Sequence, residues 1–229
     1  FRRVLFRSRE QSILRRHPWI FSGAIARETS KTADGDWVRV TGEDGTVLGW
    51  GHYQKGSITV RVLEFGDTLR PDLYHHRIKE AWRMRQLPGV IPSGTNCFRL
   101  IHGEGDGLPG LVVDVYGSVA VIQAHSAGMT CDSERISEAL LSSGPAEIKS
   151  VFFRSTSEEQ GKWMVGQNNG LLTVHENNHK FEVDVEKGQK TGFFLDQREN
   201  RELLGRYSSG KKVLNTFCYS GDRKSTRLN

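Results

Sequence analysis

The sequence has few cysteines and no long apolar run, and each absence excludes a class of protein. Cys97, Cys131 and Cys218 are odd in number and far apart, so they form neither a disulfide framework nor a CxxC metal motif. No stretch approaches the ~18 apolar residues of a membrane helix, and the first residues lack the apolar run of a signal peptide. We therefore expect a cytoplasmic protein with reduced thiols, no metal and no membrane partner.

The chain also lacks net charge over most of its length. The total is +5, but Arg2, Arg3 and Arg7 contribute +3 and residues 222–229 contribute +2. Residues 8–221 therefore carry no net charge. Overall basicity gives no reason to infer a nucleic-acid partner, so such a partner has to be inferred from local clusters.

The apolar residues that are present make up 36% of the chain, enough for a folded core. Between residues 37 and 63, short alternating apolar runs are broken by glycine turns, which predicts a small antiparallel sheet or barrel. A short helix over 12–14 and an extended turn at His17-Pro18-Trp19 precede it, because the residue before proline avoids the helical region.

A second pattern begins near residue 72, where apolar spacing predicts a helix over 72–87 with Leu73, Ile78, Trp82 and Met84 inward. We then expect strands over 98–101, 111–116 and 119–124, a helix over 131–141 and strands over 151–153, 171–175 and 180–185. Beyond Gly188 come a loop over 189–195, a helix over 197–207 and a strand over 212–215, which together predict the opening of an α/β domain.

Two motifs match known patterns but lack the context that their chemistry needs. His175 to His179 matches HExxH, which binds zinc from one face of a helix. Here the flanking residues alternate at period two around Asn177-Asn178, so a hairpin is predicted. Residues 105–110 match GxGxxG, but a strand pattern follows where a dinucleotide site needs a helix. We interpret both motifs as connections between antiparallel strands.

Three segments together resemble the rRNA large-subunit methyltransferase I family, which makes 5-methylcytosine in ribosomal RNA. They are SILRRHPWIFSGAI at 12–25, RLIHGEGDGLPGL at 99–111, and GQKTGFFLDQRENR at 188–201 followed by VLNTFCYSG at 213–221. The resemblance implies an α+β architecture. It starts with a small β-rich PUA-like RNA-binding domain over 8–68 and continues with a central α/β (strand-strand-helix-strand-strand) domain over 72–187. The start of a Rossmann-like S-adenosylmethionine (SAM) methyltransferase domain, truncated, follows over 188–221.

Residues 1–7 and 222–229 depart from the family pattern, and we expect both to be non-native tails. The resemblance also implies SAM as cofactor and ribosomal RNA as partner, and it leaves a homodimer open as the assembly.

The local cluster Arg15, Arg16, His17 and Trp19 supports an RNA site, because it offers cations for phosphates and an aromatic face for bases. Its chemistry alone equally supports Trp19 and Phe21 in the core beside two solvated arginines. The resemblance favours RNA contact by the arginines and keeps the aromatic side chains in the core.

A second set of residues borders the SAM pocket by resemblance, although loop polarity of this kind is ordinarily helix capping. The set is Thr191, Gly192, Asp196, Gln197, Arg198, Asn215, Phe217, Tyr219, Ser220 and Gly221.

By resemblance, catalysis uses a cysteine thiolate that adds to cytosine C6 so that C5 attacks the SAM methyl group. In the family that cysteine lies downstream of these segments, so no catalytic residue is assigned here, and Cys218 lies in the glycine turn instead. We expect the 229-residue chain to bind SAM weakly or not at all and to be inactive. The alternative is a free-standing PUA-type RNA-binding protein without catalysis.

Overall fold

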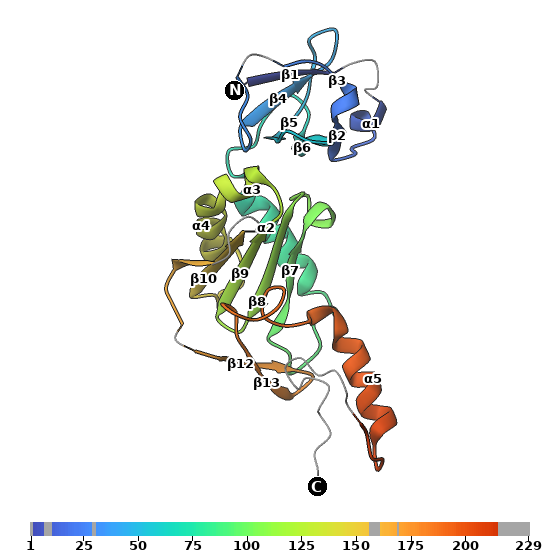
Figure 1. Ribbon diagram of the computed structural model, residues 1–229, viewed down its shortest axis with the longest axis vertical. Coiled ribbons are helices and arrows are strands. Elements are labelled where there is room, and N and C mark those ends of the chain that lie inside the picture. Colours follow the sequence, from blue (N-terminus) through green and yellow to red (C-terminus); the bar gives the residue numbers. More distant parts are fainter. Residues whose placement is uncertain (1, 7–10, 29–30, 156–160, 169, 215–229) are drawn as a thin grey trace.

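The computed structural model describes residues 2–6, 11–28, 31–155, 161–168 and 170–214. Figure 1 shows a β-rich first domain at the N-terminal end, a central sheet with helices on one side, and a hairpin and a long helix at the other end. No helix among these residues is long and apolar enough to cross a membrane.

The first domain is one six-stranded sheet in the order β2-β6-β5-β4-β1-β3. Its elements are β1 (Arg2–Phe6), α1 (Gln11–Leu14), β2 (Trp19–Phe21), the 3₁₀ turn η1 (Ser22–Ala24), β3 (Ile25–Glu28), β4 (Trp37–Thr41), β5 (Val47–Tyr53) and β6 (Ile58–Phe65). β4, β5 and β6 pair antiparallel, as the glycine-interrupted pattern predicts. The buried valines of β4 and β6 and Tyr53 of β5 form a core that also contains Ile13 of α1 and Ile20 of β2.

The strand β1 differs from the sequence expectation of a tail outside the domain. It pairs parallel with β4 and antiparallel with β3, and Val4 is fully buried among the core valines. The sequence predicts a PUA-like domain from residue 8, whereas in the structure residues 2–6 already form a strand of its sheet. A five-residue strand that begins with two arginines gives too short an alternation to be predicted. Whether residues 1–7 are native is a separate matter and stays a prediction.

The central domain is a five-stranded sheet in the order β11-β10-β9-β8-β7. Its elements are α2 (Leu73–Arg85), β7 (Cys97–His102), η2 (Gly103–Asp106), β8 (Leu111–Tyr116), β9 (Val119–Ala124), α3 (Ala127–Cys131), α4 (Ser133–Ser143), β10 (Ser150–Ser155) and β11 (Lys162–Val165). β9 and β10 are parallel and are joined through α3 and α4, whereas the other pairs are antiparallel. α2 and α4 cover one face of the sheet (Figure 1) and bury Ile78 and Leu140 against it.

Two details of this domain differ from the sequence expectation. The short edge strand β11 was not predicted, because its residues are only half-buried and show no apolar alternation. Met84, expected to point inward on α2, is 46% exposed. The other predicted strands and the helices predicted over 72–87 and 131–141 are present in order, whereas the short helix α3 was not predicted. β7 and β8 form the antiparallel pair expected around residues 105–110.

The opposite face of the central sheet is covered by the hairpin β12 (Leu172–Glu176) and β13 (His179–Val183). Asn177 and Asn178 form its turn, with φ of 49° and 65°, the left-handed values of a two-residue hairpin turn. The predicted hairpin is confirmed, and the two histidines of the HExxH match lie on opposite strands.

The last elements are η3 (Leu195–Gln197) and α5 (Arg198–Ser208), close to the predicted helix over 197–207. The predicted strand over 212–215 is not formed at residues 212–214, where no neighbouring strand among the described residues pairs with them. Residue 215 lies outside the described part.

Candidate functional site

The RNA-candidate residues lie on a sharp turn between α1 and β2. Arg16 adopts a left-handed φ of 60°, and the His17 amide donates to the Ser12 carbonyl at 2.9 Å, so α1 ends and the chain reverses into β2. The turn places Arg15, Arg16 and His17 on the surface. The sequence cluster is thus kept together as one exposed polar group.

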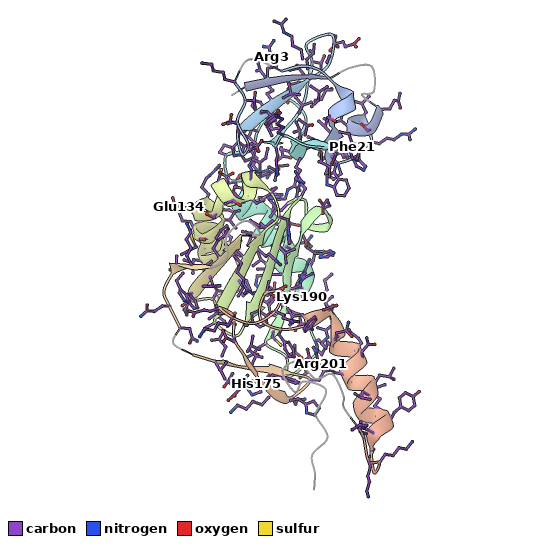
Figure 2. The ribbon with its side chains drawn as sticks, viewed as in Figure 1. Arg3, Phe21, Glu134, His175, Lys190 and Arg201 are labelled. Carbon is purple, nitrogen blue, oxygen red and sulfur yellow. The ribbon has the colours of Figure 1, made fainter. Side chains whose placement is uncertain are left out.

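The neighbouring aromatic rings are more exposed than a core position would allow. Phe21 is 49% exposed, so the expectation of a core position is wrong for this ring, and Figure 2 shows it projecting from the first domain. Trp19 is half-buried and meets Phe21 edge-on at 6.4 Å between ring centroids. Both rings and Arg15 line a cavity of about 490 Å³, which combines a cation with aromatic surface as unpaired RNA requires.

Thr191 and Gly192, the first of the SAM-candidate residues, are buried against the central sheet. The Thr191 hydroxyl donates to Asp114 Oδ2 at 2.6 Å and lies 2.8 Å from the Tyr116 hydroxyl. Gly192 has a φ of 128°, and a Cβ there would lie 2.8 Å from Val183 Cγ1, so glycine is required for close packing. The contacts of both residues are structural.

Asp196, Gln197 and Arg198 lie at the junction of η3 and α5, nearer the surface. Asp196 and Arg198 line a cavity of about 330 Å³ together with Arg99 and His102 of the central domain. Partial burial raises the pKa of Asp196, but hydrogen bonds from Lys190 and Gln197 outweigh it and lower the pKa overall. This carboxylate is therefore charged at neutral pH and is able to accept hydrogen bonds from a ligand.

The remaining SAM-candidate residues, Asn215, Phe217, Tyr219, Ser220 and Gly221, lie outside the described residues. The structure thus brings together Asp196, Gln197 and Arg198, with Thr191 and Gly192 anchoring the loop that leads to them. In Figure 2, Lys190 of this loop and Phe21 of the first domain lie at different levels of the molecule. The two candidate groups are separate sites.

This loop is held by a set of charged side chains that the sequence pattern did not predict. Asp114 is fully buried and accepts hydrogen bonds from Arg99 Nε at 2.8 Å as well as from Thr191. An aspartate inside an apolar strand was a signal available in the sequence, because a buried carboxylate requires partners. Arg154 donates to the main-chain carbonyls of Glu186 and Gly188, which holds the start of the loop.

A buried ion pair secures the helix that follows the loop. Arg201 donates to both carboxylate oxygens of Glu176 at 2.7 and 2.6 Å, and its guanidinium lies 4.3 Å from the centroid of the Phe193 ring. The side chains of the pair are only 6% and 3% exposed. The glutamate of the HExxH match therefore holds α5 against the hairpin.

The first and central domains meet around the carboxylate of Asp132. Its Oδ2 accepts hydrogen bonds from Trp37 and His52 of the first domain, at 2.8 and 3.1 Å, and from Tyr74 of α2 at 2.6 Å. Gly128 permits this contact, since a Cβ there would lie 2.1 Å from the His52 ring. The joint fixes the first domain on the central one.

Among the cysteines, Cys97 is buried at 1% exposure. The pKa of the Cys97 thiol is raised to about 12, mainly by burial and to a smaller extent by the Glu176 carboxylate. A thiol that stays protonated at neutral pH is a poor nucleophile, so Cys97 has a packing role. Cys131 is exposed at the end of α3, and Cys218 lies outside the described residues.

Comparison with protein families gives two matches, one to the first domain and one to the later part of the chain. Residues 4–65 match the model of a PUA-like domain, which covers the six-stranded sheet apart from the first two residues of β1. Residues 138–226 match the model of an S-adenosylmethionine-dependent methyltransferase, which includes the loop and α5.

Curated relatives match nearly the whole chain. "Ribosomal RNA large subunit methyltransferase I" of Aeromonas salmonicida is 38% identical over 95% of this chain and 57% of its own length. The proteins of the same name from Shewanella amazonensis and Escherichia coli are 38% and 36% identical, over 93% and 96% of this chain and 56% and 58% of their own lengths. The chain thus spans little more than half the length of these relatives.

Solved structures share the fold at low sequence identity. A candidate SAM-dependent methyltransferase from Streptococcus mutans superposes with a TM-score of 0.75 at 17% identity, over 89% of this chain and 54% of that chain. A candidate methyltransferase crystallised with SAH gives a TM-score of 0.74 at 17% identity, over 89% of this chain and 53% of that chain. The chain is therefore similar, over nearly all of its length, to proteins named ribosomal RNA large subunit methyltransferase I.

Proposed function

We propose that the protein represented by this chain transfers a methyl group from SAM to large-subunit ribosomal RNA. The observation that carries the proposal is the match of 95% of the chain to relatives of that name, with a PUA-like domain ahead of methyltransferase sequence. In this assignment the first domain binds RNA and the loop at Thr191 to Arg198 leads to the SAM site. The joint at Asp132 supports it, because it links the first domain to the central domain, to which Thr191 of the loop is hydrogen-bonded.

We further propose cytosine C5 as the methylated position, following the resemblance stated above. That chemistry needs a thiolate nucleophile and a base taken out of its stack. The buried, protonated Cys97 does not fit the role, and by resemblance the nucleophile lies beyond the segments matched here. The 229-residue chain is accordingly proposed to lack methyl-transfer activity.

The proposed RNA contacts are Arg15, Arg16, His17 and Trp19. Three of these four side chains are exposed, and the fourth lines the cavity that Arg15 also lines. Their exposure fits a surface that meets a long, charged ligand.

Among the proposed SAM-site residues, Asp196 and Arg198 fit a ligand best, because both line a cavity. A carboxylate at Asp196 suits hydroxyl or amino donors of the cofactor. Thr191 fits less well, since its hydroxyl is engaged by Asp114 and Tyr116, so its proposed role is to fix the loop. SAM itself supplies the electrophilic methyl group.

The boundaries that go with this proposal are a PUA-like domain over 8–68, a central domain over 72–187 and methyltransferase sequence from 188. The segment β1 joins the first of these in the structure.

The test is methyl transfer from tritiated SAM to large-subunit rRNA, with product nucleosides separated after digestion. The parent gene's full product should label the RNA as 5-methylcytidine, and the 229-residue chain should not. Labelling by the chain alone would overturn the proposed location of the chemistry. A full product that binds rRNA and never methylates it would favour the alternative of an RNA-binding protein without catalysis.

A further inference from the structure

A cleft lies between the first and central domains. Of the residues proposed above to contact RNA or SAM, Trp19 is the one that lines it. Its volume is about 360 Å³, within the range of small-ligand sites. Trp19 and Arg61 line it from the first domain, and His102, Glu104 and His125 line it from the central domain. The 3₁₀ turn η2, which carries Glu104, forms part of its wall.

The cleft adjoins both candidate sites through shared side chains. Trp19 also lines the cavity next to Arg15 and Phe21, and His102 also lines the cavity next to Asp196 and Arg198. A ligand that runs from the RNA-candidate cluster toward the SAM-candidate loop along these cavities therefore passes through the cleft.

The side chains of the cleft are held in place by hydrogen bonds. Trp19 Nε1 donates to Glu104 Oε1 at 2.8 Å, so the indole and the carboxylate fix each other across the two domains. Arg61 is half-buried and donates to Gln54 Oε1 at 3.3 Å, while Gln54 also accepts from the Ala127 amide. A carboxylate with one acceptor site used keeps capacity for further donors.

His125 adds a group that both donates and accepts. The pKa of His125 is lowered, mainly by partial burial and to a smaller extent by the positive charge of Arg99. The Glu104 carboxylate raises this pKa but offsets the lowering only in part. The ring is therefore neutral at pH 7, with one nitrogen as donor and the other as acceptor.

The chemistry of the cleft suits a nucleobase better than a phosphate. Arg61 is the one arginine that lines the cleft. The negative charge of Glu104 acts on it, so these two charges offset each other and leave no excess of positive charge to attract a phosphate. An indole supplies stacking surface, and a carboxylate is the acceptor that recognises the amino group of cytosine.

We propose that this cleft binds an unpaired RNA base that carries an exocyclic amino group. The proposal rests on the proposed function in taking RNA as the ligand, and it adds a contact made by the central domain. The base held here is a neighbour of the methylated one, because the cleft is separate from the SAM-candidate loop.

Gly105 offers a way to fill the cleft without disturbing the fold. It lines the cleft, and a Cβ there meets no atom within 4 Å and no unfavourable φ. Gly205 on α5 has the same freedom and lies outside the cleft, so Gly205→Phe is a matched control for Gly105→Phe.

The first experiment uses fluorescence anisotropy to measure binding of the 229-residue chain to a fluorescein-labelled hairpin RNA with a cytidine loop. Gly105→Phe should weaken binding roughly tenfold, and Gly205→Phe should leave it unchanged. With abasic nucleotides in the loop, wild-type and Gly105→Phe chains should bind alike. Equal affinity of Gly105→Phe and wild type for the cytidine loop would overturn the proposal.

The second experiment tests recognition of the exocyclic amino group. Cytidine carries this group at C4, where uridine carries a carbonyl oxygen. The wild-type chain should prefer the cytidine loop over a uridine loop by roughly fivefold, and Glu104→Gln should lose that preference while melting like wild type. Glu80→Gln changes a side chain on α2 that is 46% exposed and lies outside the cleft, and this variant should retain the preference. Equal binding of both loops by the wild-type chain would overturn the assignment of an amino-bearing base.

These results are distinguishable from failure of the proposed function. If the chain binds the cytidine loop through the cleft and the full product transfers no methyl group, the base site stands and the methyltransferase proposal falls. If the full product methylates rRNA and Gly105→Phe has no effect on RNA binding, the cleft assignment falls alone.

Discussion

The two candidate sites differ in how their side chains are held. Arg15, Arg16 and His17 are exposed on a turn, whereas Thr191 is fully buried and its loop is fixed by Asp114 and Arg154. An RNA surface must adapt to a flexible ligand, and a loop beside a cofactor must keep its geometry. Substitution of the buried polar residues that hold the SAM-candidate loop should therefore lower stability first, and should affect function as a consequence of that loss.

The largest effect is expected from breaking the buried pair Glu176–Arg201. Glu176→Ala leaves the Arg201 guanidinium buried without its carboxylate, which costs about 3–5 kcal/mol of unfolding free energy. Urea denaturation followed by circular dichroism measures it. His175→Ala, an exposed neighbour on the same strand, should change stability by less than about 0.5 kcal/mol. Equal stability of both variants would contradict the structural role of the HExxH glutamate.

The fold was predictable where periodicity is long, and the site was predictable only in part. The alternation of β4 to β6 and the Asn177-Asn178 turn gave correct elements, because side-chain spacing and turn chemistry are local properties. The partners of Asp114 and Glu176 come from segments up to 77 residues away in sequence, so no local pattern reveals them. The exposure of Phe21 likewise depends on which strands flank β2.

The joint at Asp132 should make stability depend on acid pH. Burial raises the pKa of Asp132, but hydrogen bonds from His52, Tyr74 and Trp37 outweigh it and lower the pKa to about 2. A lowered folded-state pKa stabilises the protein above the unfolded value, and that contribution is lost as the pH falls from about 4 toward 2. The carboxylate should contribute about 2 kcal/mol at pH 7.

Unfolding free energies of wild type and Asp132→Asn between pH 7 and 3 measure this contribution. The difference between them should shrink as the pH falls. A constant difference over this range would contradict the lowered pKa.

Thr191 tests whether a SAM-candidate residue acts through the fold. Thr191→Val removes the hydroxyl between Asp114 and Tyr116 and should lower the unfolding free energy by about 1–3 kcal/mol without any cofactor present. Thr191→Ser keeps the hydroxyl and should recover most of the loss. If Thr191→Val melts like wild type and only SAM affinity falls in the full protein, the residue is a direct cofactor contact instead.

The smallest effect on stability is expected at the RNA-candidate turn, where the effect on binding should be largest. Arg15→Gln combined with Arg16→Gln should change the unfolding free energy by less than about 0.5 kcal/mol, since both side chains are exposed. Thermal melting measures this, and Arg83→Gln, an exposed arginine on α2, is the control. A cooperative loss of structure would show that the turn itself depends on these arginines.

Equilibrium binding of the chain to a large-subunit rRNA transcript over a series of salt concentrations tests the central claim most directly. The wild-type chain should bind, and the double variant of Arg15 and Arg16 should bind more weakly with the slope of log affinity against log salt reduced by about 2. Arg83→Gln should match wild type. No binding by the wild-type chain, or equal slopes for the double variant and wild type, would contradict an RNA-binding first domain with its contacts at this turn.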